Sequence, residues 1–288
     1  MVPAAPILVL LGLTLRAVWF FTPAGYPDAD EAVFGLMALH IQQGREYPLY
    51  CWGAHYAGTA VSYLAALGYS LIGMGVPALK GATLPFVAGY LGATYGIARL
   101  LFDARSALVA LAVAAVPPAT ALTLSVKATG GYPETLCFGS LVLLLAFRLP
   151  ASAQSAHDLR RHLALLGLAG GFGLYVLPLV TPYLVVAGWF LYRHHRPALS
   201  GGNVAWLAAA GLAGVSPMLV YNLQHSGATV LRLGSRVLNV SRADAAGAVD
   251  NPAMVVAWLG QYMAGLPEHL ASVVRNVGPL LDLDGAAG

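Results

Sequence analysis

Long apolar runs constrain the fold of this chain more than any other feature. A transmembrane helix needs about 20 apolar residues to cross roughly 30 Å of hydrocarbon. The chain is 58% hydrophobic with a mean hydropathy of +0.71, and 9% of its residues are charged, against about 25% in soluble domains. We therefore predict an all-α, polytopic integral membrane protein with about seven transmembrane helices. The predicted spans are 6–22, 80–101, 106–126, 134–149, 163–176, 177–192 and 203–223.

The arginines between these runs predict how the chain crosses the membrane. Basic loops remain on the cytoplasmic side, so the turns that carry arginine lie inside and the intervening loops lie outside. The first span then leads into an outer loop, 22–80, and residues 127–134 also lie outside. This pattern places the candidate site on the outer face. We expect a protein of the bacterial inner membrane or another plasma membrane. The orienting arginines are Arg99, Arg105, Arg148, Arg160, Arg161, Arg193 and Arg196.

One further apolar stretch, 57–75, is also long enough to cross. A crossing there would place the later arginines on the wrong side, so we expect an amphipathic helix at the outer interface. A true span remains the alternative interpretation. Within 163–192, Pro178 and Pro182 should divide the run into two short helices. The adjacent Pro117–Pro118 should kink the third span.

The apolar signal weakens after residue 223. We therefore interpret 1–223 as a transmembrane module and 224–288 as an outer-face segment with amphipathic pieces such as 254–270. The last residues do not resemble a helix terminus or an anchor, which favours truncation as one interpretation.

An acidic cluster, Asp28, Asp30 and Glu31, follows the first span at its outer end. A helix that begins at Asp28 would place Glu31 three residues later, as in a capping box. Such a helix start directs its free N–H groups and the positive end of its dipole at nearby anions. Capping accounts for Asp28 and Glu31 and leaves Asp30 without a structural role.

The segment 30–35, which reads Asp-Glu-Ala-Val-Phe-Gly, resembles the Asp-Glu motif in the first outer loop of the GT-C glycosyltransferases. Its pattern is similar to that of the protein O-mannosyltransferases and the lipid A aminoarabinose transferases. The order of elements matches too: one span, an acidic pair opening an amphipathic helix, an interfacial helix, and a basic residue before the next span. The resemblance covers about 1–225.

The resemblance implies a glycosyltransferase that uses a polyprenyl-phosphate sugar on the outer face and inverts the anomeric carbon. Asp30 would be the catalytic base that activates an acceptor hydroxyl. Glu31 would assist it or help to hold a divalent metal, Mg²⁺ or Mn²⁺. The acceptor would be a lipid, a glycan or a protein. Membrane lipids would be further partners, and nucleic acid would not be a partner.

A second outer segment, 127–134, lies on the same predicted face as Asp30. There Lys127 would meet the donor phosphate, Tyr132 would contact substrate, and Glu134 would be a sugar ligand or a third metal ligand beside Asp30 and Glu31. The alternative is an anchoring lysine and a solvated glutamate.

Three more residues are candidates for substrate binding. His55 precedes the predicted interfacial helix, where it would bind phosphate, ligate a metal or form an ordinary hydrogen bond. Lys80 precedes the next span and is either a phosphate contact or an anchor. Arg16 lies within the first span, where a charge is costly and usually paired; Asp28 and Asp30 are its nearest predicted partners, and snorkelling is the alternative.

Two other classes of function compete with glycosyl transfer. A transporter or lipid flippase would place ionisable groups at mid-membrane and show internal repeats, whereas the acids here cluster at one face. A noncatalytic or truncated relative is the other alternative. The glycine-rich segment 170–173 lies inside an apolar run, which favours close helix packing over phosphate binding.

Overall fold

The computed structural model describes residues 4–149 and 156–229. The chain divides into two compact units, Met1–Tyr221 and Asn222–Gly288. Most of the predicted outer segment 224–288, with its amphipathic piece 254–270, lies outside the described residues. The first unit is mostly helical, which confirms the all-α prediction.

The N-terminal part of the first unit combines one long helix with a group of short elements. Strands β1 and β2 form an antiparallel pair in which Tyr50 lies opposite Gly58 and Cys51 opposite Ala54. The predicted helix at 57–75 is present as α3, and its place relative to a membrane remains a prediction. The elements are α1 (Ala4–Trp19), η1 (Pro23–Gly25), α2 (Ala29–Gln42), β1 (Tyr50–Cys51), β2 (Ala54–Gly58), α3 (Ala60–Ile72) and α4 (Val76–Gly81).

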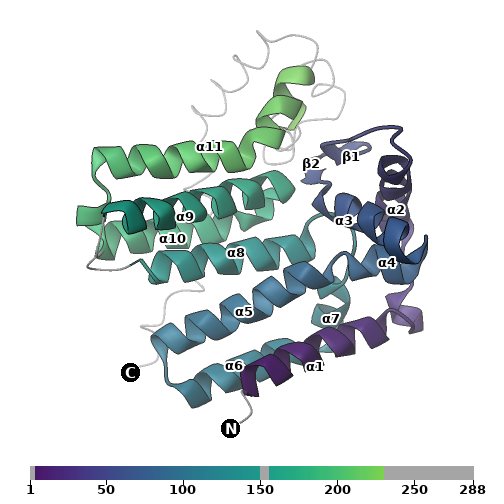
Figure 1. The fold of residues 1–288 in the computed structure, drawn as a ribbon, viewed down its shortest axis with the longest axis horizontal. Helices are drawn as coiled ribbons and strands as arrows, with labels where there is room; N and C mark the ends of the chain where they lie inside the picture. Colours follow the sequence, from purple (N-terminus) through teal and green to yellow (C-terminus); the bar gives the residue numbers. More distant parts are fainter. Residues whose placement is uncertain (1–3, 150–155, 230–288) are drawn as a thin grey trace, which may run out of the picture. The chain divides into compact units, whose positions relative to one another are not determined.

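The remaining helices of the unit run side by side, and α2, α3, α4 and the strands gather at one end of them (Figure 1). Helix α5 packs against α1, α6 and α8, and α8 packs in turn against α9 and α10. These elements are α5 (Leu84–Leu101), α6 (Ala104–Ala115), α7 (Ala119–Ser125), α8 (Tyr132–Phe147), α9 (Ala156–Val176), η2 (Pro178–Val180), α10 (Thr181–His194), η3 (Arg196–Ala198) and α11 (Gly201–Gln224).

The prolines break the helices where the sequence predicts. A missing N–H and the ring clash of proline end a regular helix. Helix α9 ends at Val176, and the short η2 turn leads into α10, so 163–192 forms two helices. Helices α6 and α7 meet at an angle of 80° across Pro117–Pro118, a sharper bend than the predicted kink.

By length and apolar composition, α11 qualifies as a single membrane-crossing helix among the described residues, and the bent pair α6–α7 qualifies jointly. Helices α1, α3 and α8 are apolar but shorter. A membrane location is therefore compatible with the structure at this coarse level.

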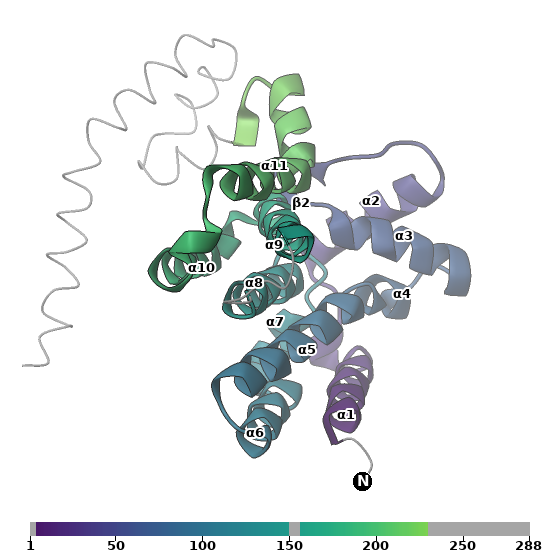
Figure 2. The ribbon, with the colours of Figure 1, turned by 60° about the vertical axis from the view of Figure 1, so that its left-hand side comes forward.

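Close packing of α9 on α11 depends on glycine. A Cβ atom on Gly171 would lie 2.1 Å from the Gly211 carbonyl oxygen, and one on Gly214 would lie 2.5 Å from the Leu168 carbonyl oxygen. The two backbones therefore touch directly, which is the use of small residues in helix pairs. Figure 2 shows α11 lying across α9.

A hydrophobic cluster fixes the short elements that carry the candidate site. Helix α2 buries Phe34 and Met37 against Val61 and Ala65 of α3, and Leu79 of α4 closes the cluster. The buried face of α2 sets its rotation, so the residues at its N-terminus have a defined direction.

Candidate functional site

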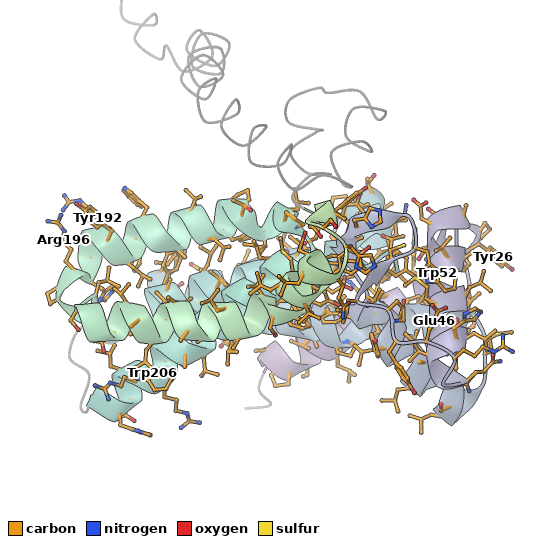
Figure 3. The ribbon with its side chains drawn as sticks, turned by 90° about the horizontal axis from the view of Figure 1, so that it is seen from above. Tyr26, Glu46, Trp52, Tyr192, Arg196 and Trp206 are labelled. Atoms are coloured by element: carbon orange, nitrogen blue, oxygen red, sulfur yellow. The ribbon has the colours of Figure 1, made fainter. Side chains whose placement is uncertain are left out.

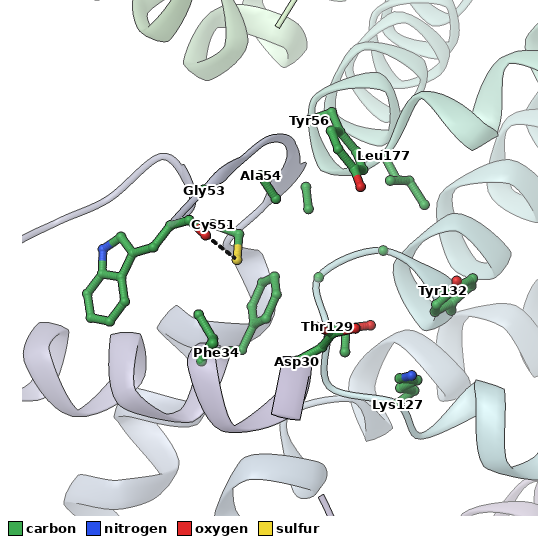
Figure 4. Close-up of a pocket in the computed structure, with 15 residues that line it drawn as sticks. Asp30, Phe34, Cys51, Gly53, Ala54, Tyr56, Lys127, Thr129, Tyr132 and Leu177 are labelled. Atoms are coloured by element: carbon green, nitrogen blue, oxygen red, sulfur yellow. Dashed lines mark hydrogen bonds between the residues drawn. The ribbon is translucent and has the colours of Figure 1, made fainter. Parts of the chain in front are cut away.

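A pocket of about 360 Å³ opens beside the N-terminus of α2. It is enclosed by α2, the strands, the segment before α8 and the η2 turn, which come from four separate parts of the sequence (Figure 4). Its lining residues are Asp30, Val33, Phe34, Cys51, Trp52, Gly53, Ala54, Tyr56, Ala57, Lys127, Thr129, Gly130, Gly131, Tyr132 and Leu177.

The acidic cluster begins α2 as the sequence predicts. The Glu31 N–H donates to Asp28 Oδ1 at 3.0 Å, and the Asp28 N–H donates to Glu31 Oε2 at 3.3 Å. These reciprocal bonds form a capping box, which satisfies two of the N–H groups that a helix start leaves open.

Glu31 also joins three segments in the interior. Its carboxylate accepts from Lys80 Nζ at 2.7 and 3.0 Å and from the Ala128 N–H at 2.7 Å. Both side chains of the Glu31–Lys80 pair are almost fully buried. Lys80 lies outside the pocket lining, so the structure places it as a partner of Glu31 and not at the predicted phosphate contact.

Asp30 differs from its two acidic neighbours. Its side chain is exposed and lines the pocket. Within 4–149 and 156–229, no hydrogen bond or ion pair occupies its carboxylate. An open carboxylate at a pocket wall is able to accept a proton from a bound hydroxyl group.

Lys127 brings positive charge to the same wall. Its Nζ lies 2.6 Å from Asp28 Oδ2, and this hydrogen bond is the main reason that the pKa of Lys127 is raised. Desolvation raises the pKa of Asp28, but the hydrogen bonds from Lys127 and the Glu31 N–H outweigh it and the net shift is downward. Both groups are therefore charged at neutral pH.

Gly130 allows the segment before α8 to reach the pocket. Its φ is +60°, and a Cβ atom there would lie 2.2 Å from the Gly58 carbonyl oxygen and 2.4 Å from Phe34 Cε1. Only glycine tolerates both the left-handed backbone and this approach. The segment then presents Tyr132, which is exposed and lines the pocket; its role as a substrate contact stays a prediction.

Glu134 does not reach the pocket. It is fully buried in the first turn of α8, where Oε2 accepts from the Gly131 N–H at 3.0 Å. Its Oε1 has no hydrogen-bond partner among the described residues. A side chain without surface exposure cannot meet a sugar in the pocket, so its predicted role as a pocket ligand is not supported by this geometry.

The predicted metal ligands do not assemble. No three His, Cys, Asp or Glu side chains of the described ranges lie close enough to hold a metal ion. Glu31 is neutralised by Lys80, and Glu134 is held by Gly131. A divalent cation takes several oxygen ligands, usually including charged carboxylates, and Asp30 is the one carboxylate of the predicted set that lines the pocket.

Arg16 serves the fold, which corrects its prediction as a substrate residue paired with Asp28 or Asp30. Arg16 is 1% exposed, and its guanidinium donates to Ser125 Oγ at 2.9 Å. It also donates to the carbonyls of Gly12, Ala114 and Ala115 at 2.9, 3.2 and 3.0 Å respectively. Two of these acceptors belong to the end of α6, whose last carbonyls the bend before α7 leaves open.

His55 lies outside the pocket lining as well. Its Nδ1 is 2.5 Å from the Tyr221 hydroxyl group, which joins β2 to α11. The structure therefore supports the ordinary hydrogen-bonding interpretation over phosphate or metal binding.

Several lining residues carry no signal in the sequence. Tyr56 and Leu177 line the pocket (Figure 4), and only the tertiary fold brings them there. Cys51 also lines the pocket. Burial, and after it the charge of Asp30, raises the pKa of its thiol to about 11, so it is a neutral side chain at pH 7 and not a nucleophile.

Comparisons with family models, with curated proteins and with solved structures give no match for this chain. The residues of the site alone therefore indicate its chemistry. They combine an open carboxylate, a lysine side chain that is 25% exposed and two helix N-termini around one cavity. The carboxylate of this set is able to accept a proton from a hydroxyl group, and the positive groups are able to stabilise an anion that gains negative charge beside it.

Proposed function

We propose that this protein is a membrane glycosyltransferase that moves a sugar from a polyprenyl phosphate to an acceptor hydroxyl group, with Asp30 as the base. The observation that carries the proposal is that the three acidic residues of the cluster differ in their contacts. Asp28 and Glu31 are used in capping and ion pairs, whereas Asp30 presents an open carboxylate to the pocket. The acceptor is a lipid, a glycan or a protein.

In this mechanism Asp30 takes the proton of the acceptor hydroxyl group as its oxygen attacks the anomeric carbon. The new C–O bond forms opposite the departing phosphate oxygen, so the configuration inverts. The bond between the anomeric carbon and the phosphate oxygen breaks, and its electron pair leaves with the polyprenyl phosphate. Lys127 compensates the charge that develops on that phosphate.

We further propose that the first unit is a polytopic bundle of about seven spans with the pocket on the outer face. Large apolar side chains are exposed along several helices, including Leu10 of α1, Val113 of α6, Val185 of α10 and Leu212 of α11. Extended apolar surface of this kind marks contact with membrane or protein. At 1.5 Å per residue, the five described helices with 16 to 24 residues, α1, α5, α8, α9 and α11, reach about 24–36 Å, which brackets the hydrocarbon thickness. Helices α6 and α10 are shorter, with 12 and 14 residues.

The proposed topology predicts which exposed positions react with a membrane-impermeant thiol reagent in intact cells. After replacement of Cys51 and Cys137 by Ser, single cysteines at Arg45 and Tyr132 should be labelled, because both residues lie at the pocket end. A cysteine at Arg161, which is exposed at the other end, should react only after the membrane is permeabilised. Labelling of position 161 without permeabilisation would contradict the arrangement.

Lys127 should contribute to the affinity of the protein for the donor. Lys127→Gln removes the ammonium group at the pocket wall, and a hydrogen bond to a charged group is worth about 1.5–3 kcal/mol. We expect the KM for a short-chain polyprenyl-phosphate sugar to rise about tenfold or more, measured with purified protein and labelled sugar. Arg45→Gln is the control, because it removes an exposed cation that does not line the pocket. An unchanged KM in Lys127→Gln would assign the lysine to anchoring alone.

A further inference from the structure

The pocket segment 128–131 is bonded at both ends to buried carboxyl groups. At its start the Ala128 N–H donates to Glu31 Oε1 at 2.7 Å, and at its end the Gly131 N–H donates to Glu134 Oε2 at 3.0 Å. Glu31 belongs to α2 and Glu134 to α8, and the two residues are 3% and 0% exposed. Both bonds are therefore shielded from water, where a hydrogen bond is electrostatically stronger.

This segment carries much of the polar side of the pocket. Lys127 directly precedes it, Thr129 lies within it and Tyr132 directly follows it, and all three line the pocket. Residues 127–131 belong to no helix or strand, so no regular ladder of backbone hydrogen bonds fixes their position. The two carboxyl groups supply that fixation from side chains.

The end of the segment also determines a second part of the wall. A Cβ atom on Gly131 would lie 2.8 Å from Leu177 Cδ2, so the Gly131 backbone packs directly on a residue that lines the pocket from the η2 side. A shift of Gly131 would change the contact with Leu177 as well as the course of the segment.

Glu134 has no other role in the proposed reaction. Its Oε1 has no hydrogen-bond partner, and no lysine, arginine or histidine of the described ranges pairs with it. A polar group buried in this way costs stability unless its hydrogen bonds offset the cost. The bond to Gly131 also caps the start of α8, and because Gly131 is a pocket residue, capping and positioning are the same contact.

We propose that Glu134 is a positioning residue for the pocket, which together with Glu31 fixes the segment 128–131 and thereby the place of Lys127. Asp30 belongs to α2, whose buried face fixes it separately. Loss of Glu134 should therefore act on donor binding more than on the base. The kinetic part of this inference rests on the proposed glycosyl transfer, whereas the positional part does not.

Amide hydrogen exchange of the purified full chain, resolved to single residues by mass spectrometry, tests the positional part. Glu134→Met nearly keeps the side-chain volume and removes the acceptor. The Ala128 amide is the informative one, because its own partner Glu31 is unaltered in this variant. We expect its exchange to become about tenfold faster, the factor that corresponds to one lost hydrogen bond. Glu134→Gln keeps an oxygen for the Gly131 N–H and should restore slow exchange.

Two controls separate positioning from a general loss of stability. Glu46→Met makes the same chemical change at a partly exposed glutamate that follows α2 and does not line the pocket (Figure 3). Leu163→Ala removes a fully buried side chain from the cluster that contains Ala146 and Leu149, at the far end of α8, and so lowers stability at a distance. Neither variant should speed exchange at Ala128 more than at other protected amides.

A double-mutant cycle on the KM for the donor tests whether Glu134 acts through Lys127. Glu134→Met should raise that KM about tenfold, as Lys127→Gln should, and kcat should fall less. The combined variant should have a KM close to that of Lys127→Gln alone, because a displaced lysine and an absent lysine have the same effect. Glu134→Gln should return the KM to the value of the unaltered protein.

Unchanged exchange at Ala128 in Glu134→Met would overturn the proposal, whether or not the protein transfers sugar. Multiplicative effects on the KM in the combined variant would also overturn it, because they would show that Glu134 does not act through Lys127. Absence of transfer in the unaltered protein would instead contradict the proposed function and leave the exchange experiment as the test. If Glu134→Met fails to fold, Glu134→Asp draws the carboxyl group back by one methylene group, and slow exchange at Ala128 in that variant would equally overturn the proposal.

Discussion

Asp30→Asn should lower sugar transfer by about 10²–10⁴-fold, the range expected when a general base is lost. Asparagine keeps the shape of the side chain and removes its ability to accept a proton. Because Asp30 is exposed and holds no partner among the described residues, the thermal midpoint of unfolding should barely move. The measurement is the initial rate of transfer of labelled sugar from a panel of short-chain polyprenyl phosphates, with circular dichroism to establish the fold.

Asp28→Asn is the matched control, because it makes the same chemical change two residues earlier. Asparagine caps helices as well as aspartate does, so α2 should still begin there. The ion pair to Lys127 is lost, and we expect transfer to fall by about tenfold or less. Near-normal transfer in Asp30→Asn together with loss of activity in Asp28→Asn would show that Asp28, and not Asp30, is the base. Full activity in both variants would contradict the proposed mechanism.

The parts of the fold that follow from short-range chemistry could be predicted from the sequence. Asp28 and Glu31 are three residues apart, and their capping box depends only on that spacing. The break between α9 and α10 and the bend at Pro117–Pro118 follow from the missing N–H of proline. Each of these features is decided within about one helical turn.

The partners of the buried charges could not be predicted in this way. Arg16 binds carbonyls of α6 that are about a hundred residues later in the chain, and Lys80 binds Glu31 across 49 residues. Sequence spacing contains no information about such pairs, because packing of α1 on α6 and of α4 on α2 creates them. The same is true of the pocket wall formed by Leu177, which depends on where the η2 turn falls.

One consequence is that the two residues of the acidic motif have different physical roles. Glu31 is buried and compensated, so it determines where the segment 127–131 lies. Asp30 is open and lines the pocket, where the proposed mechanism uses it as the base. Substitutions at the two positions should therefore separate loss of structure from loss of catalysis.

Lys80→Met should destabilise the protein by about 3–5 kcal/mol, because it leaves the Glu31 carboxylate buried without its counter-ion. For a chain of this size the thermal midpoint should fall by about 10 °C, measured by thermal unfolding in detergent. The double variant Lys80→Met/Glu31→Gln should recover most of that loss, because a buried pair replaced by neutral groups of similar shape is often no less stable. Arg45→Gln, which removes an exposed cation, should change stability by less than about 0.5 kcal/mol.

The double variant also separates positioning from catalysis. Glutamine at position 31 still offers an oxygen to the Ala128 N–H, so the segment that carries Lys127 should return to its place. We then expect the double variant to regain transfer, with kcat near that of the unaltered protein and any deficit in the KM for the donor. A double variant that is as stable as the unaltered protein but has lost kcat would show that Glu31 acts in the chemical step. A Lys80→Met variant of unchanged stability would show that the Glu31–Lys80 pair does not hold these three segments together.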